Sequence, residues 1–211
     1  MGHRKLALLY TKESDPMGIP LVIVESPAKA RTISRFLGDD YKVEASIGHI
    51  RDLIGRASDL PPAQQKQPGT KLGVDTENGF VPYYIVPKEK KAQVKQLREQ
   101  IKDASALYLA TDEDREGESI SWHLVQVLKP EIPVYRLVFH EITVSAIQKA
   151  LASPRQVDES LVKAQEARRI VDRLFGYPVS ELLWRKVGPK LSAGRVQSVA
   201  VRLVVDRERA R

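Results

Sequence analysis

The chain has 211 residues, of which 42% are hydrophobic and 29% charged, so it can bury a sizeable core and is neither disordered nor collagen-like. It contains no cysteine, which excludes disulfides, thiolate zinc sites and a cysteine nucleophile within this chain. No apolar run approaches the roughly 20 residues of a membrane helix, and the run at residues 5–10 is too short for a signal peptide. We therefore expect a soluble intracellular protein that does not enter a membrane.

Positive charge is concentrated in the last quarter of the chain. The formal net charge is +7, and residues 155–211 carry 13 basic and 7 acidic side chains, which accounts for nearly all of the excess. Such a block attracts polyanions, of which nucleic acid is the commonest. A solvated helix face with an uneven charge mix produces the same pattern, so charge by itself leaves both interpretations open.

Strands and helices are predicted to alternate after a tail at residues 1–18. Apolar runs and turn residues predict strands over residues 21–24, 42–47, 83–86, 106–110 and 134–139. Helices are predicted from Pro27 to Leu37, over 88–102, from the acidic turn at 112–118 to Leu128, and over 144–151. Residues 55–82 are rich in Pro, Gln and Gly and are predicted to be a surface excursion. The alternation predicts an α/β fold with a mainly parallel sheet flanked by helices.

From about Leu161 the strand signals stop, and a helical segment is predicted. Its apolar stripe consists of Leu161, Ala164, Ala167, Val171 and Leu174. We expect this helix to end at Gly176-Tyr177-Pro178, with more helix around a break at Gly188-Pro189. The predicted organisation is a tail (1–18), an α/β domain (19–153) and the incomplete start of a helical domain (154–211).

At alternate positions within seven residues, where a buried strand meets a helix, the chain carries Asp112, Asp114, Glu116 and Glu118. Ligands gather at the carboxyl ends of parallel strands, and clustered carboxylates stay ionised when a cation is supplied. Oxygen ligands without cysteine or paired histidine favour a hard ion such as Mg²⁺. The alternative is an acidic helix N-terminus that complements the helix dipole, which explains one or two acids better than four.

Glu25 follows a second buried strand, at residues 21–24. The adjacent Ser26 fills the helix-capping role, which leaves Glu25 free for chemistry. If the two strands are neighbours, Glu25 converges on Asp112 and Asp114. A carboxyl group facing such a site can be held protonated by like charges and act as a general acid or base.

Five motifs, taken in order along the chain, closely resemble the type IA DNA topoisomerases of bacteria. They are Val22–Ala30, Ser46–Leu53, Tyr108–Glu118, Gln165–Tyr177 and Leu191–Arg202. The acidic motif by itself is shared with primases and other Toprim proteins, whereas the five together are specific to this family. The resemblance covers about residues 20–210.

The resemblance implies a Toprim domain that holds Mg²⁺ through Asp112 and Asp114, with Glu116 helping and Glu25 beside the metal. It implies part of an ATP-independent, nucleoid-associated cytoplasmic enzyme, expected to be a monomer, that relaxes negatively supercoiled DNA. Such enzymes cut one strand through a tyrosine, hold a 5′-phosphotyrosyl link and reseal, and Glu25 would aid proton transfer at the 3′-oxygen. None of the seven tyrosines stands in the family's nucleophile context, so we expect no relaxation by this chain alone.

A single-strand DNA groove is implied for the helical segment. Its arginines suit phosphate oxygens, and its aromatic rings offer surfaces for base stacking, although core packing is the ordinary alternative for Trp184. His49 by itself would be an unremarkable loop histidine, and the resemblance favours a DNA contact for it. Lys29, in the first turn of the helix after Glu25, is a further candidate for a phosphate contact. The predicted DNA-binding residues are His49, Arg168, Arg169, Asp172, Tyr177, Trp184, Ser192, Ala193, Gly194, Arg195, Val196 and Gln197.

Two other functions fit part of the sequence. A Toprim primase or nuclease would explain Glu25 and the Asp112/Asp114 pair, but not the two motifs after residue 160. A non-catalytic DNA-binding module would bind a single strand without forming a covalent adduct.

Overall fold

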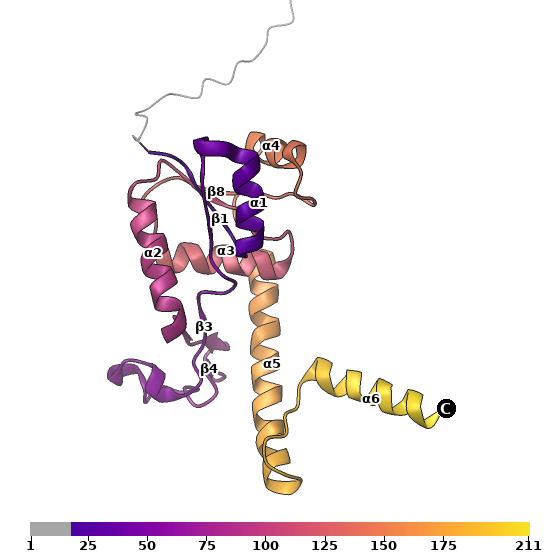
Figure 1. The fold of residues 1–211 in the computed structure, drawn as a ribbon. Coiled ribbons are helices and arrows are strands. Elements are labelled where there is room, and N and C mark those ends of the chain that lie inside the picture. The colour runs from indigo at the N-terminus through magenta and orange to yellow at the C-terminus, as the bar shows by residue number, and fades with distance from the viewer. Residues whose placement is uncertain (1–17) are drawn as a thin grey trace, which may run out of the picture.

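The computed structural model describes residues 18–211, and a four-stranded parallel sheet lies at its centre (Figure 1). The strand order is β2-β1-β7-β8, with bounds Lys42–Ala45, Leu21–Val24, Leu107–Leu109 and Val134–Arg136. Every neighbouring pair is parallel. The predicted α/β class with a parallel sheet is confirmed. The predicted tail, apart from Gly18, lies outside the described residues.

Helices cover both faces of this sheet. Helices α1 (Pro27–Leu37) and α4 (Val144–Ala152) pack on one face, where Ile33 and Ile147 meet Val22 and Val24. Helices α2 (Lys91–Lys102) and α3 (Arg115–Leu128) pack on the other, around Leu21 and Ile23. All four side chains of β1 are buried, which explains why this strand is a continuous apolar run.

The predicted surface excursion, residues 55–82, and the residues on either side of it form two short antiparallel strand pairs. Strand β3 (Asp52–Leu53) pairs with β6 (Tyr84–Ile85), and β4 (Val74–Asp75) pairs with β5 (Val81–Pro82), both antiparallel. Leu53 and Val74 are buried against Ile170 of the long helix α5. The excursion therefore supports the helix that carries the predicted DNA-binding arginines.

Helix α5 (Glu159–Lys186) is a single 28-residue helix, so the predicted end at Gly176-Tyr177-Pro178 is wrong. Pro178 lies inside the helix, where proline removes a backbone hydrogen bond. Contacts beyond it hold the last turns: the Trp184 indole donates to the Leu191 carbonyl, and Ser180 Oγ accepts from the Ala193 amide. A last helix, α6 (Arg195–Arg209), follows an eight-residue connection at 187–194.

The predicted apolar stripe of α5 is also wrong. Ala164, Ala167 and Val171 are exposed, and the helix instead buries Val162, Gln165, Ile170, Arg173 and Ser180. The buried face is mixed because α5 packs against polar groups: Arg173 donates to the carbonyl of Ile54 at 2.8 Å. Among residues 18–211, no helix is both long and apolar enough to cross a membrane.

Candidate metal and nucleic-acid site

Glu25 and Asp112 come together at the carboxyl ends of the neighbouring strands β1 and β7. Lys29, in the first turn of α1, forms ion pairs with both carboxylates. Ser26 caps α1 by accepting from the Lys29 amide, which places the lysine one turn above Glu25. The predicted convergence of Glu25 on Asp112 is therefore present, with one ammonium group between two carboxylates.

Electrostatics at this edge favour the charged forms. The hydrogen bond from Lys29 holds the pKa of Asp112 below its usual value, although partial burial opposes this shift. Burial opposes charge on Lys29, but its hydrogen bonds to Asp112 and Glu25 raise its pKa above the usual value. Oε2 of Glu25 is buried and has no hydrogen-bond partner among the described residues. A buried oxygen without a donor, next to a second carboxylate, suits a hard cation such as Mg²⁺.

The other two predicted ligands, Asp114 and Glu116, have protein partners. Asp114 caps α3 by accepting from the Gly117 amide at 2.7 Å. Glu116 contacts His49 and Gln165. Within residues 18–211 no group of three or more acidic, histidine or cysteine side chains is arranged to hold a metal ion. Of the four predicted metal ligands, Glu25 and Asp112 thus form a two-carboxylate edge, and the side chains of Asp114 and Glu116 bind other protein groups.

A tight turn after β2 directs His49 toward Glu116. Ile47 and Gly48 both have left-handed backbones, with φ of 57° and 75°. This conformation is a genuine outlier for a β-branched residue such as Ile47, and outliers of this kind concentrate at functional sites. The Gly48 amide donates to the Glu25 carbonyl at 2.7 Å, so the turn is fastened to the end of β1.

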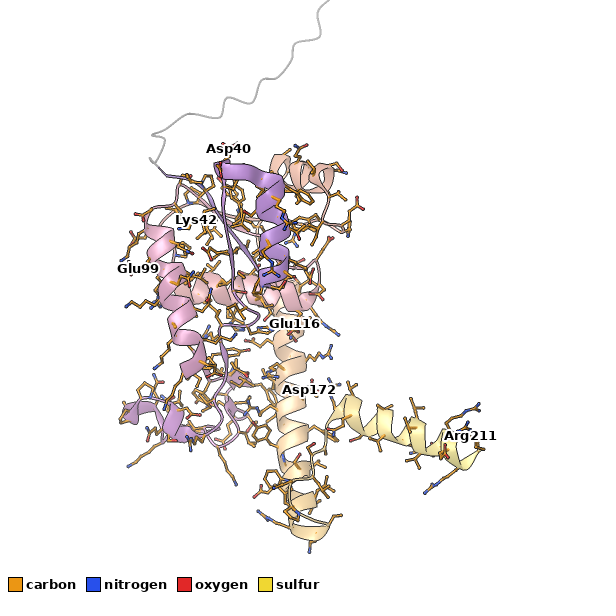
Figure 2. The ribbon with its side chains drawn as sticks, in the orientation of Figure 1. Asp40, Lys42, Glu99, Glu116, Asp172 and Arg211 are labelled. Carbon is orange, nitrogen blue, oxygen red and sulfur yellow. The ribbon has the colours of Figure 1, made fainter. Side chains whose placement is uncertain are left out.

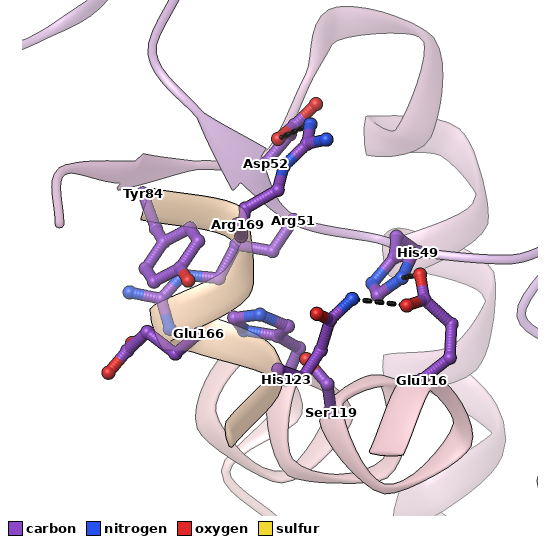
Figure 3. A pocket seen from close by; sticks show the side chains of 10 residues that line it. His49, Arg51, Asp52, Tyr84, Glu116, Ser119, His123, Glu166 and Arg169 are labelled. Carbon is purple, nitrogen blue, oxygen red and sulfur yellow. Dashed lines mark hydrogen bonds and ion pairs between the residues drawn. The ribbon is translucent and has the colours of Figure 1, made fainter. Parts of the chain in front are cut away.

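A cavity of about 110 Å³ lies beside this histidine (Figure 3). Figure 3 shows His49 meeting Glu116, with Arg169 beside Asp52 across the cavity. Gln165 donates to the other carboxylate oxygen of Glu116. Its lining residues come from the turn after β2, from β3, β6, α3 and α5: His49, Arg51, Asp52, Tyr84, Glu116, Ser119, His123, Gln165, Glu166 and Arg169. The cavity joins the acidic turn to the helix predicted to bind DNA.

The predicted DNA-binding arginines of α5 differ in their surroundings. Arg169 pairs with Asp52 at 2.5 Å, and its side chain is 48% exposed. Arg168 and Arg195 both pair with Asp172, at 3.8 and 2.6 Å. Arg173, one turn after Arg169 on the same helix, is buried, and its guanidinium lies over the Tyr177 ring at 4.2 Å from the centroid. Three arginines therefore remain accessible to a phosphate.

Tyr177 and Trp184 lie farther along α5, on the part that extends away from the sheet. Both are about half exposed, at 48% and 52%, and they line a depression together with Lys71 and Leu72. Ser192, Ala193, Gly194, Arg195, Val196 and Gln197 lie in the connection and first turn of α6, and Gly194 caps that helix without a side-chain hydrogen bond. In Figure 2 Glu116, in the first turn of α3, lies near the start of α5, and Asp172 lies midway along α5. These residues are thus spread along a surface away from the acidic edge.

The sequence reasoning missed several residues of the cavity. Arg51 lies over the rings of Tyr84 and Trp122, at 4.8 and 5.9 Å from their centroids. Arg51 belongs to the same motif as His49, which was a signal for it, whereas Tyr84 and His123 carry no sequence signal. Tyr84 and His123 line the cavity because β6 and α3 pack around it.

More than half of the chain, residues 20–142, matches the family model of the Toprim domain, and the chain belongs to this family. Residues 156–211 match a second model, described as DNA topoisomerase. Toprim domains generally use a divalent metal. The order of the two matches agrees with the order of the motifs along the chain.

The particular relatives are bacterial topoisomerases. The chain is 64% identical over 191 residues to DNA topoisomerase 1 of Synechococcus elongatus, covering 90% of this chain and 22% of that protein. It is 60% identical over 203 residues to DNA topoisomerase 1 of Streptomyces coelicolor, covering 95% of this chain and 21% of that protein. Full-length topoisomerase I from Thermotoga maritima superimposes with a TM-score of 0.74 at 46% identity, covering 90% of this chain and 30% of that structure. The resemblance drawn from the motifs is confirmed, and the chain spans about a fifth of the length of the curated relatives.

Proposed function

We propose that this chain is the metal-binding and strand-holding part of an ATP-independent type IA DNA topoisomerase. The whole enzyme would relax negatively supercoiled DNA by transient cleavage of one strand through a 5′-phosphotyrosine. This chain would bind Mg²⁺ and a single-stranded segment of that DNA, as a monomer acting on the nucleoid in the cytoplasm. The nucleophilic tyrosine of the whole enzyme would not be one of the seven tyrosines in these 211 residues.

The observation that carries the proposal is the meeting of Glu25 and Asp112 at a single cation, Lys29. Mg²⁺ is usually bound through one or two carboxylates together with substrate phosphate, because it keeps several of its waters. Glu25 and Asp112 supply that pair. Asp114 and Glu116 remain proposed ligands, which requires them to exchange Gly117, His49 and Gln165 for the metal.

Glu25 would move the proton in this chemistry. When bound, Mg²⁺ would neutralise charge on the phosphate during transfer. As the tyrosine hydroxyl loses its proton to solvent and its oxygen bonds to phosphorus, the bond from phosphorus to the DNA 3′-oxygen would break. Glu25, in its protonated form, would donate its proton to that 3′-oxygen and take it back on resealing. Lys29 would contact the same phosphate once its carboxylates bind the metal.

The helical half would hold the strand. Arg168, Arg169 and Arg195 offer exposed guanidinium groups for phosphates, and Asp172 orients two of them. Tyr177 and Trp184 offer half-exposed rings for stacking bases. The accessible arginines and rings therefore follow α5 away from the acidic edge.

Magnesium binding is tested by titrating the purified chain and following amide shifts by NMR. We expect weak binding that perturbs residues 110–116 and Glu25 first, because the site lacks its phosphate ligand. Asp112→Asn should abolish those shifts, whereas Asp103→Asn, which removes an exposed acid at the end of α2, should leave them unchanged. Unchanged shifts in Asp112→Asn would place the metal elsewhere.

A further inference from the structure

Glu118 belongs to the acidic motif but points away from the other acids. Its side chain is fully buried, whereas that of Asp112 is 60% exposed and that of Glu116 is 52% exposed. We propose that Glu118 is a positioning residue that fastens the start of α5 to the acidic turn, and is not a ligand of the metal. The assignment of its effect on DNA binding rests on the proposed function.

Three residues, one from β8 and two from the connection between α4 and α5, donate hydrogen bonds to this single carboxylate. Arg136 of β8 donates from Nε at 3.1 Å. Arg155, in the segment after α4, donates from both terminal nitrogens at 2.8 and 3.0 Å. The backbone amide of Asp158 donates at 2.6 Å, and Asp158 is the residue that caps α5. Glu118 therefore joins α3 and β8 to the residue where α5 begins.

The same network reaches the metal edge through Arg136. This arginine is buried, and its terminal nitrogens donate to the carbonyls of Leu109 at 3.0 Å and Asp112 at 2.6 Å. Arg136 and Arg155 also exchange two backbone hydrogen bonds, at 2.8 and 3.0 Å. A continuous path of hydrogen bonds thus runs from the Asp112 backbone through Arg136 and Glu118 to Asp158, the residue that caps α5.

This path explains how helix α5 can contact both the acidic turn and the wall of the cavity. From its fixed start, α5 carries Gln165 to Glu116 and Arg169 to the far wall of the cavity. A buried carboxylate facing two guanidinium groups leaves uncompensated charge when one partner is removed, so the fastening depends on charge as well as shape. Losing it should allow the start of α5 to move relative to the sheet.

The absence of cysteine allows spin labels to be placed at chosen positions, so the position of α5 can be measured directly. One label replaces Gln148 on α4 and the other replaces Lys163 on α5, both exposed. We expect a narrow distance distribution in the otherwise unchanged chain. Glu118→Gln keeps the size of the side chain but not its charge, and should broaden the distribution and weaken single-strand DNA binding severalfold. Glu131→Gln removes an exposed acid after α3 and should change neither quantity.

Arg155→Gln provides a second variant in case Glu118→Gln does not fold. Arg155 is 36% exposed, so its loss leaves the buried Glu118–Arg136 pair in place and removes the charged part of the link toward α5, while the Asp158 amide still donates to Glu118. It should broaden the distribution as well, and Arg155→Lys should restore part of the narrow distribution. A narrow distribution in Arg155→Gln and in any folded Glu118→Gln would overturn the proposal. If the distances change as expected but the unaltered chain binds no single-stranded DNA, the proposed function fails while the positioning role stands.

Discussion

His123 is a buried histidine at the cavity. It carries no sequence signal, and its protonation state is set by its surroundings in the fold. Its side chain is 4% exposed, and Nδ1 has no hydrogen-bond partner among the described residues. Burial lowers its pKa from 6.5 to about 3, and the nearby charges of Arg51 and His49 act in the same direction, against a weaker opposing effect of Asp52. The Tyr84 ring lies edge-on to it at 4.7 Å. The folded protein therefore keeps this ring neutral at neutral pH.

A neutral buried histidine makes stability depend on pH in a defined direction. His123 takes up a proton near pH 6.5 in the unfolded chain and only near pH 3 in the folded chain. Its stabilising contribution to the free energy of unfolding is therefore complete above pH 6.5 and is lost as the pH falls. From pH 6.5 to 5 the free energy of unfolding should fall by up to about 2 kcal/mol. Denaturant unfolding at both pH values should show this loss, and His123→Phe should reduce it. The exposed variant His140→Gln should retain the full loss, and an equal loss in His123→Phe would contradict the assignment.

At the scale of elements, the parts specified by local signals were predictable. Ser26-Pro27 marks the start of α1, and the apolar run at 21–24 marks a strand buried on both faces. Helix α5 was not predictable in its end or its buried face, because tertiary contacts decide both. Its turns beyond Pro178 depend on residues 191–193, and the burial of Arg173 depends on carbonyl groups of residues 53–54.

Gly117 is the element-scale feature on which the acidic turn depends. A Cβ atom at this position would lie 2.2 Å from the carbonyl oxygen of Asp112, so only glycine lets the first turn of α3 pack there. Gly117→Ala should lower the free energy of unfolding by about 1–3 kcal/mol and weaken Mg²⁺ binding, because the Asp112 backbone must shift. Gly188→Ala meets no atom within 4 Å and is the matched control in the same melting and titration experiments. Equal stability of the two variants would show that the turn tolerates the shift.

At the scale of the whole molecule, the proposed metal edge and the proposed strand-binding surface are separate regions that are joined through α5. The charge distribution in the sequence indicated this division, since the positive surplus lies in residues 155–211 whereas Glu25 and the acidic motif at 112–118 lie before them. The convergence of Glu25 on Asp112 followed from parallel neighbouring strands. The partners of Asp114, Glu116 and Glu118 did not follow, because they depend on side-chain directions that spacing does not fix.

The division is tested most directly by the salt dependence of single-strand DNA binding without Mg²⁺. Arg169→Ala removes one exposed phosphate contact, so the slope of log affinity against log salt should become shallower by about 0.7. Lys102→Ala, at the end of α2, should leave the slope unchanged, and Asp112→Asn should bind at least as tightly as the unaltered chain. The account would be contradicted if Arg169→Ala kept the full slope while Asp112→Asn abolished binding.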